Sequence, residues 1–329
     1  MDGREHHWFI LISSILPLLA TVVGVVLLWN TAVGVSDLIA FGVMYVICGL
    51  GVSTGYHRLL AHRAFTTSRP LRIFFAAGGA MAGQGPPLTW TAHHRRHHRV
   101  ADRPGDPHSP YAGEEPGVKA GLRGLWHAHL GWLFDEDLSS DPMRYCPDLA
   151  RDKDIRFISR HFVAFVAAGL ILPGLIGLAL TGTFVGFLTG VLWGGLVRFF
   201  IGNHITYAIN SLGHYFGPRR FATADESRNV SWLAVFSFGE SWHNNHHAFP
   251  RSFTHGMQWY EIDLSAMVIR ALEKLGLVHD VIRIDRELMD QRARSLARIG
   301  GGRKVVAPAP DQPMAKANGG RPAGITDVE

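Results

Sequence analysis

Four long apolar runs constrain the fold of this chain more than any other feature of its sequence. They cover about residues 9–28, 38–56, 162–180 and 184–209 of 329, and only the last contains a charge, Arg198. About 20 apolar residues are enough to cross the hydrocarbon core of a bilayer. A soluble protein does not need four such segments for its core. The runs therefore predict an all-α integral membrane protein with four transmembrane helices.

The connections between the runs predict two hairpins with a defined orientation. Residues 29–37 and 181–183 contain no Lys or Arg, whereas residues 57–161 and the chain after 209 contain fifteen each. Positively charged segments stay on the cytoplasmic side of a membrane. We therefore expect a multi-pass protein of the cell (inner) membrane, with both termini and both large polar segments in the cytoplasm.

The two polar segments, 57–161 and 210–299, are expected to form a cytoplasmic helical cap, so that residues 1–299 make one membrane domain. Within the cap, residues 73–88 are uncharged but too short and too rich in Gly and Pro for a span. We expect an interfacial or buried cytoplasmic helix there. Residues 300–329, half of which are Gly, Pro or Ala, are expected to be disordered.

Composition excludes several classes of protein. The content of 47% hydrophobic residues and the net charge of +5 exclude a disordered chain. Two cysteines, Cys48 and Cys146, are too few for a thiolate zinc ribbon or an iron–sulfur cluster. The 19 histidines are the unusual feature, and their spacing is informative.

The pattern His-x-x-His-His occurs twice, at residues 94–98 and 243–247. Positions i, i+3 and i+4 share one face of a helix, so three imidazoles can converge there on metal. The arginines around the first group are also compatible with a basic helix that faces nucleic acid. The second group has no basic neighbour closer than Arg251. The repetition therefore favours a metal site, and no nucleic-acid partner is expected.

Other histidines at the ends of the apolar runs extend this set. The candidate ligands are His57, His62, His94, His97, His98, His214, His243, His246 and His247. Eight or nine imidazoles exceed the four ligands of one zinc ion and suit two ions. Imidazole binds iron, zinc, copper and nickel. Iron can activate dioxygen, as the oxidation of an unactivated carbon–hydrogen bond requires.

Three motifs resemble the histidine boxes of membrane fatty-acid desaturases. They are His57-Arg-Leu-x-x-His62, His94-x-x-His97-His98 and His243-Asn-x-His246-His247. The further motif Asn210-Ser-x-x-His214 is similar to the stearoyl-CoA (Δ9 acyl-CoA) desaturase family, here of a bacterial type without a fused cytochrome b5 domain. The resemblance runs from about residue 56 to residue 277.

The resemblance implies two iron ions held by the nine histidines, with Asn210 reaching one of them through a water. It implies a dioxygen-dependent desaturase that introduces a cis double bond, at Δ9, into a long-chain acyl-CoA. Zinc can replace iron in purified proteins of this kind. Electrons are expected from a separate donor, which is a ferredoxin, a flavoprotein reductase or a cytochrome.

Single residues also match positions of the family. Gln84, Trp90, Thr206 and Tyr207 match positions around the kink of the substrate tunnel. Asp106 and Glu240 match acidic positions near the boxes. These two carboxylates either orient ligating histidines or are ordinary surface acids. Arg198 also matches the family, and a functional charge, a structural ion pair and a snorkelling side chain all remain open for it.

The expected acyl carrier, CoA, lacks some of its usual contacts, because the places where animal members hold CoA here carry Gly85, Ala92, His93 and Glu136. Other basic residues are then needed for the phosphates, such as Arg95, Arg99, Arg103 or Arg123. An acyl carrier protein or a lipid is the alternative carrier. A related di-iron hydroxylase or ketolase is the first rival function, and a membrane metal transporter or sensor is the second.

Overall fold

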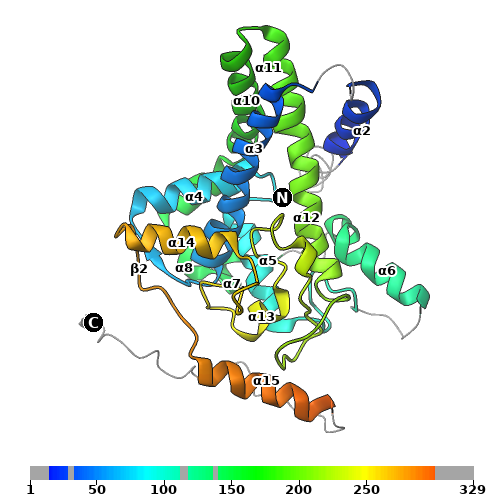
Figure 1. Ribbon diagram of the computed structural model, residues 1–329, viewed down its shortest axis with the longest axis vertical. Coiled ribbons are helices and arrows are strands. Elements are labelled where there is room, and N and C mark those ends of the chain that lie inside the picture. Colours follow the sequence, from blue (N-terminus) through cyan, green and yellow to red (C-terminus); the bar gives the residue numbers. More distant parts are fainter. Residues whose placement is uncertain (1–14, 29–32, 112–117, 136–139, 301–329) are drawn as a thin grey trace.

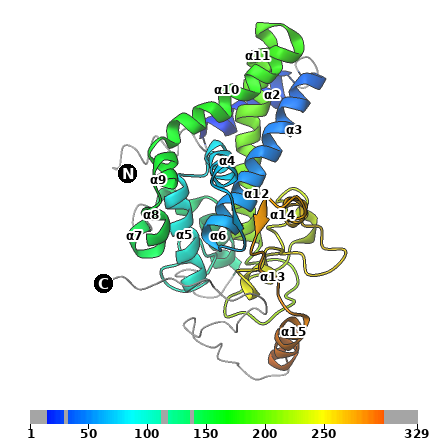
Figure 2. The same cartoon turned by 90° about the vertical axis from the view of Figure 1, so that its left-hand side faces the viewer.

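The computed structural model describes residues 15–28, 33–111, 118–135 and 140–300. These residues are mostly helical. Long apolar helices form one end of the molecule, and shorter helices and loops form a cap at the other (Figures 1 and 2). The only strands among the described residues form a two-stranded ladder, in which β1 (Thr66–Thr67) pairs antiparallel with β2 (Val278–His279).

Three helices are long and apolar enough to cross a membrane. They are Val35–Ala61, Phe162–Thr181 and Phe184–Leu212, and they contain the predicted runs 38–56, 162–180 and 184–209. The first predicted span is represented by α2 (Leu16–Leu28), which is too short to cross by itself. The remainder of that run and part of the connection 29–37 lie outside the described residues. A fourth span, and the hairpin that it would form, therefore stay predictions.

Two of the spanning helices change their winding along their length. Helix α3 (Val35–Leu50) continues into the π-helical segment η2 (Gly51–Ala61). Helix α11 (Phe184–Gly190) continues through π-helical η5 (Val191–Val197) into α12 (Arg198–Leu212). The remaining span is α10 (Phe162–Thr181). Wide turns of this kind are rare and concentrate at functional sites. Here they lie on the two spans that lead into the cap.

The cap consists of short helices from both polar segments. They are α4 (Arg69–Met81), α5 (Pro87–Val100), α6 (Val118–His129), η3 (Gly131–Phe134), α7 (Pro142–Tyr145), α8 (Pro147–Ala150), α9 (Lys153–Arg160), η6 (Ser231–Leu233), α13 (His243–Ala248), α14 (Leu264–Lys274) and α15 (Arg286–Gly300). The largest hydrophobic core lies beneath α4 and α5 and includes Tyr56, Phe65, Phe75, Ile155 and Ile269. This core fixes the lower end of the second apolar run against the cap.

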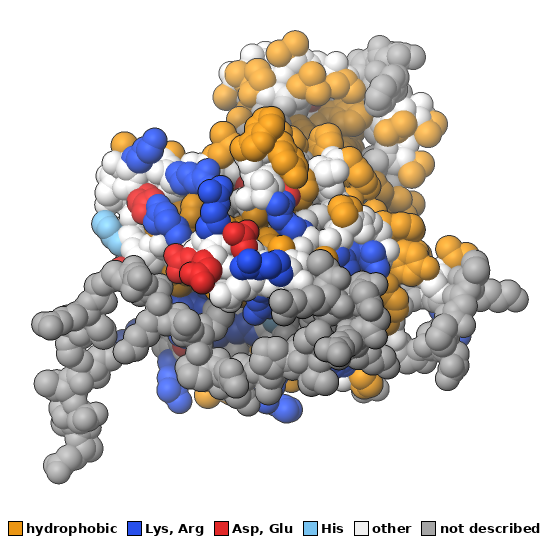
Figure 3. Space-filling view, turned by 60° about the horizontal axis from the view of Figure 1, so that its bottom comes forward, with side chains coloured by type: hydrophobic (Ala, Val, Ile, Leu, Met, Phe, Trp, Pro, Cys, Tyr) orange, Lys and Arg blue, Asp and Glu red, His pale blue; other side chains and the backbone are white. Residues whose placement is uncertain are grey.

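The helix predicted over residues 73–88 is shorter than expected. It is α4, which ends at Met81 because Gly83 and Gly85 turn the chain with φ of 75° and 110°. Pro87 then begins α5, at a helix position that proline favours. The predicted disordered tail is 300–329. Its first residue, Gly300, ends helix α15, and residues 301–329 lie outside the described residues. Lys and Arg side chains gather on the cap, and hydrophobic side chains cover the spanning end (Figure 3).

Candidate metal centre

The first two candidate ligands, His57 and His62, are brought together by the π-helical winding of η2. In an α-helix, residues five apart point about 140° away from each other, because each residue turns about 100°. In η2 the His62 backbone N–H donates to the His57 carbonyl at 3.0 Å, a bond that spans five residues rather than four. The wide turn therefore places both imidazoles on one side of the helix, where their ring centroids lie 4.8 Å apart.

Helix α5 directs its three candidate ligands in two directions. His94 and His98 are one turn apart and their ring centroids are 4.6 Å from each other. His97 points elsewhere, and its Nε2 lies 3.3 Å from the Nε2 of His247. A single helix thus contributes to two neighbouring sites.

The second His-x-x-His-His group behaves in the same way. It forms the short helix α13, all of which is buried. His243 and His247 join His97, whereas the Nε2 of His246 lies 2.8 Å from that of His98. His214 follows the end of α12, and its Nε2 lies 2.9 Å from that of His243.

The nine predicted ligands therefore form two groups in which all the coordinating nitrogens lie within 4.8 Å of one another. The five-histidine group is His57, His62, His94, His98 and His246. The four-histidine group is His97, His214, His243 and His247. Every predicted histidine belongs to one group, and each group has enough nitrogens for one metal ion.

Carboxylates hold the Nδ1 atoms of four of these histidines. The pairs are His57 with Glu240, His97 with Asp106 at 2.9 Å, His214 with Asp102 at 2.8 Å, and His247 with Asp225 at 2.9 Å. A carboxylate on Nδ1 fixes the ring and directs the Nε2 lone pair toward a metal. In the absence of metal, these Nε2 atoms would face one another with lone pairs or, if protonated, with like charges. A cation between them removes this conflict, so the residues fit a metal ion in each group.

The charged groups around the two histidine groups also fit a bound metal ion in each. Four carboxylates contact the two groups, and two divalent cations would balance their negative charge. Burial, reinforced by neighbouring imidazoles, lowers the pKa values of His94, His98, His243 and His246. These side chains are therefore neutral near pH 7, and neutral imidazole is the form that binds metal.

Two of the carboxylates, Asp102 and Asp225, are absent from the sequence prediction. Asp102 has a left-handed φ of 59°, which Asp tolerates better than most residues. It also accepts hydrogen bonds from the Ser109 hydroxyl and the Glu226 backbone. Asp225 lies in the loop between α12 and α13. Neither residue has a sequence spacing that relates it to its histidine, so only the folded loops reveal it.

A buried ion network, also unforeseen, supports Glu240. Arg58 has no exposed surface, and it binds both Glu240 at 3.0 Å and Asp263 at 2.9 Å. Its guanidinium also contacts His255 Nδ1 at 3.2 Å. Asp263 in turn accepts the Ala266 N–H at the start of α14. The network therefore couples the first histidine motif to the other polar segment of the cap.

The remaining predicted residues lie at different distances from the metal groups. The Trp90 ring stacks on His94 with centroids 5.0 Å apart. Asn210 lies on α12 about one turn before His214 and is half-buried. Tyr207 is buried, and its ring lies 6.5 Å from that of Trp132. It does not line the cavity described next.

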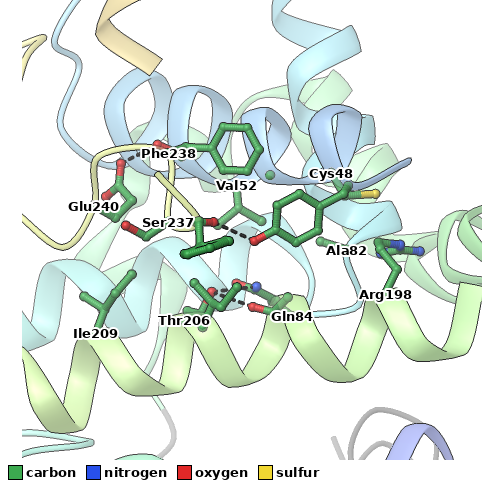
Figure 4. Close-up of a pocket in the computed structure, with 16 residues that line it drawn as sticks. Cys48, Val52, Ala82, Gln84, Arg198, Thr206, Ile209, Ser237, Phe238 and Glu240 are labelled. Carbon is green, nitrogen blue, oxygen red and sulfur yellow. Dashed lines mark hydrogen bonds between the residues drawn. The ribbon is translucent and has the colours of Figure 1, made fainter. Parts of the chain in front are cut away.

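That cavity lies between the spans and reaches Glu240, the carboxylate that holds His57 (Figure 4). Glu240 lines one end, and Cys48 and Arg198 line the other. Between these ends the Gln84 amide donates to the Thr206 hydroxyl at 2.8 Å. Of the four predicted tunnel residues, Gln84 and Thr206 therefore line the cavity. Arg198 lies at its membrane end.

Arg198 is 2% exposed, and its guanidinium donates to three backbone carbonyls. They belong to Gly194, Met81 and Gly169, which lie on three different helical segments. These bonds give Arg198 a structural role, with neutral carbonyls as its partners in place of the ion pair that the sequence left open.

Comparison with known proteins identifies the family. A sequence model described as fatty acid desaturase matches residues 36–281. The chain belongs to the fatty acid desaturase family. Membership places it among oxidoreductases of lipid metabolism, which take a lipid substrate and need an electron donor.

Three relatives show how the acyl carrier varies. The chain is 43% identical over 284 residues to hex-5-enoyl-(acyl-carrier protein) acetylenase of Moorena producens, with 85% of this chain and 87% of the relative covered. It is 41% identical over 246 residues to Delta-9 acyl-lipid desaturase 1 of Arabidopsis thaliana, with 73% of each covered. It is 38% identical over 242 residues to acyl-CoA C20 Delta5-desaturase of Anemone leveillei, with 72% of this chain and 71% of the relative covered. The names of these relatives do not favour the expected acyl-CoA over an acyl carrier protein or a lipid.

Proposed function

We propose that this desaturase is a dioxygen-dependent enzyme of the cell membrane that introduces a cis double bond, at Δ9, into a long fatty acyl chain. The observation that carries the proposal is the convergence of nine histidines beside a cavity that runs between spanning helices. Both features are required to oxidise an unactivated carbon–hydrogen bond in a long apolar chain.

We assign one iron ion to each histidine group, with Asn210 reaching the ion of the four-histidine group through a water. Two bound iron ions would supply the activation of dioxygen that the reaction needs. The nine histidines hold the ions, and the carboxylates Asp102, Asp106, Asp225 and Glu240 keep the rings in place. Because these contacts are formed within the folded cap, the ligand geometry is fixed before substrate enters.

The chain's own contribution to selectivity is positioning. Along α12, the cavity extends from Ile209 to Arg198, roughly 16 Å at 1.5 Å per residue. The cavity itself is only about 50 Å³, so an acyl tail along this length would have to part its walls, and burial of its methylene groups would then hold it. The Gln84–Thr206 pair lies between the deep end and the metal centre, and so determines which carbons stand beside the metals.

We infer that the acyl carrier is a lipid or an acyl carrier protein rather than CoA. Ala92 is fully buried and cannot contact a phosphate, and Gly85 offers no side chain. The Nδ1 atom of His93 is 3.1 Å from the Ser140 hydroxyl. Glu136 lies outside the described residues. Two of the relatives described above act, by their names, on a carrier-protein or lipid substrate, which supports the same choice.

Expression in a host that lacks a desaturase, followed by profiling of fatty acids, tests the reaction. We expect a cis-monounsaturated product that is absent from cells with the empty vector. A hydroxylated product without an alkene would instead favour the hydroxylase. Isotope-labelled acyl-lipid, acyl-carrier protein and acyl-CoA, supplied separately to the purified chain with reductant, test the carrier. Faster conversion of acyl-CoA than of the other two would contradict our choice.

We also propose that the active site faces the cytoplasm, because the basic residues lie on the cap (Figure 3). Electrons would come from a separate ferredoxin, flavoprotein reductase or cytochrome. An acidic donor would be attracted to this surface.

A further inference from the structure

Two loops of the cap, together with the helical turn η6 and the start of α14 that adjoin them, expose an unusual set of large apolar side chains, which we call the aromatic platform. Its members and their exposed fractions are Trp232 65%, Phe236 57%, Trp259 93%, Tyr260 56%, Ile262 48% and Met267 57%. They come from residues 231–236 and 259–267. Single exposed apolar residues are ordinary, but a group of this size marks an interaction surface.

The first loop of the platform lies directly against a spanning helix. The Tyr45 hydroxyl of α3 donates to the Phe236 carbonyl at 2.6 Å. The Tyr45 ring lies 5.6 Å from that of Phe238. Phe238 packs so closely on Gly49 that a side chain there would overlap its ring. Because Tyr45 and Gly49 belong to the apolar span Val35–Ala61, this loop reaches the level of the bilayer.

The second loop is fixed to the first. The Trp242 indole N–H donates to the Ile262 carbonyl at 2.8 Å, and the Ser265 N–H donates to the Phe238 carbonyl at 3.2 Å. The two loops therefore form one surface, which continues the lipid-facing side of α3. Val46 on that side of α3 is itself 47% exposed.

Helix α14 adds positive charge at the edge of the platform. Met267, Arg270 and Lys274 are exposed at positions i, i+3 and i+7, so they share one face. Met267 and Arg270 also line a surface hollow with Trp259 and Ile262. An apolar face bordered by basic residues is typical of helices that lie in the interfacial layer of an anionic membrane. In Figure 1, α14 lies across the direction of the spans.

We propose that the aromatic platform is inserted in the headgroup layer of the leaflet on the cap's side, with Arg270 and Lys274 against anionic phospholipid. Trp and Tyr favour this layer because their rings are apolar at one end and polar at the other. Phe236 also lines the cavity that reaches Glu240. The platform therefore places bilayer lipid beside the wall of this cavity. The proposal concerns membrane contact and does not depend on the reaction.

Depth-dependent quenching tests the insertion. The purified full chain, with Cys48 and Cys146 replaced by Ala, receives one labelled cysteine as Trp259→Cys or Ile262→Cys. Gln291→Cys serves as the control because it is exposed on α15, at the far end of the cap. Each variant carries an environment-sensitive fluorophore and is placed, one chain per disc, in lipid nanodiscs that contain phosphatidylglycerol and phosphatidylcholine.

We expect the labels at 259 and 262 to shift to the blue and to be quenched by nitroxides near the lipid headgroup. The label at 291 should be quenched only by a water-soluble reagent. Equal behaviour of the three labels would overturn the proposal. So would protection that appears only in discs holding two chains, because the occupant would then be a second copy.

The charge of the lipid tests the role of α14. With the label at 259, the double variant Arg270→Glu, Lys274→Glu should lose the extra lipid quenching that phosphatidylglycerol gives over phosphatidylcholine alone. The matched control Arg286→Glu, Arg294→Glu on α15 should retain it. Retention in both variants would refute the contact with anionic headgroups.

Discussion

The two histidine groups lie side by side but are supported in different ways. In the four-histidine group, three of the four rings are held by aspartates, Asp102, Asp106 and Asp225. In the five-histidine group, Glu240 alone among these acids holds a ring, and it also lines the cavity. The difference indicates that the four-histidine group is the more rigid one. Through Glu240, the five-histidine group is connected to the cavity in which an acyl chain would react.

Removal of a ligand should have the largest effect in either group. His94→Ala and His243→Ala each delete one nitrogen, from the five-histidine and the four-histidine group respectively. We expect each to abolish desaturation, measured as fatty-acid product in a host without desaturase, and to lower the iron content of the purified chain from about two ions toward one. His279→Ala, on the exposed surface, should leave both quantities unchanged. Full activity of either ligand variant would contradict the assignment.

Loss of a supporting carboxylate should have an intermediate effect that depends on the group. Asp225→Asn keeps the shape of the side chain but weakens its hold on His247. We expect a loss of metal affinity of about 10–100-fold, measured by competition with a chelator. Asp102→Asn should act similarly through His214. Asp285→Asn, on the cap surface away from both groups, is the control. If neither change moves metal affinity, the aspartates do not explain the rigidity of the four-histidine group.

A substitution in the wall of the cavity should have the smallest effect. It should change which carbons are desaturated and leave metal binding unchanged. Thr206→Val removes the acceptor of the Gln84 amide while keeping the volume of the side chain. We expect iron content to stay near two ions and the distribution of double-bond positions to broaden, as gas chromatography of the products would show. An unchanged distribution would mean that the Gln84–Thr206 pair does not position the chain.

Helical spacing explains which parts of the candidate metal centre can be predicted from the sequence. The repeats at 94–98 and 243–247 share a face by the i, i+3, i+4 rule. That rule does not separate the middle histidine of each repeat, His97 or His246, from its two neighbours. In the structure each of them belongs to the group opposite to that of its flanking histidines. The two groups are therefore a property of the tertiary structure.

His57 and His62 show a second limit of sequence reasoning. Their spacing of five fits no face of an α-helix, and only the π-helical η2 aligns them. No residue type in Gly51–Ala61 requires this winding. The supporting aspartates are less visible still, because Asp102 and Asp225 are distant in sequence from the histidines that they hold. Loop closure, rather than local pattern, brings each pair together.

The fold is easier to predict from the sequence than the metal centre, because the hydrophobicity of a whole segment indicates whether it can span a membrane. Three of the four predicted runs are helices that are long enough to cross a membrane. The boundary near Met81 was missed because the left-handed turns at Gly83 and Gly85 interrupt an otherwise apolar stretch. A glycine in the sequence allows a left-handed turn but does not show whether the chain makes one there.

The central claim is that two iron ions occupy the two histidine groups of an active desaturase. Anomalous diffraction at the iron absorption edge, from crystals of the full chain in a preparation that desaturates an acyl substrate, tests it most directly. We predict two iron peaks, one enclosed by His57, His62, His94, His98 and His246, and the other by His97, His214, His243 and His247. An active preparation with a single iron peak, or with no iron at either group, would contradict the account.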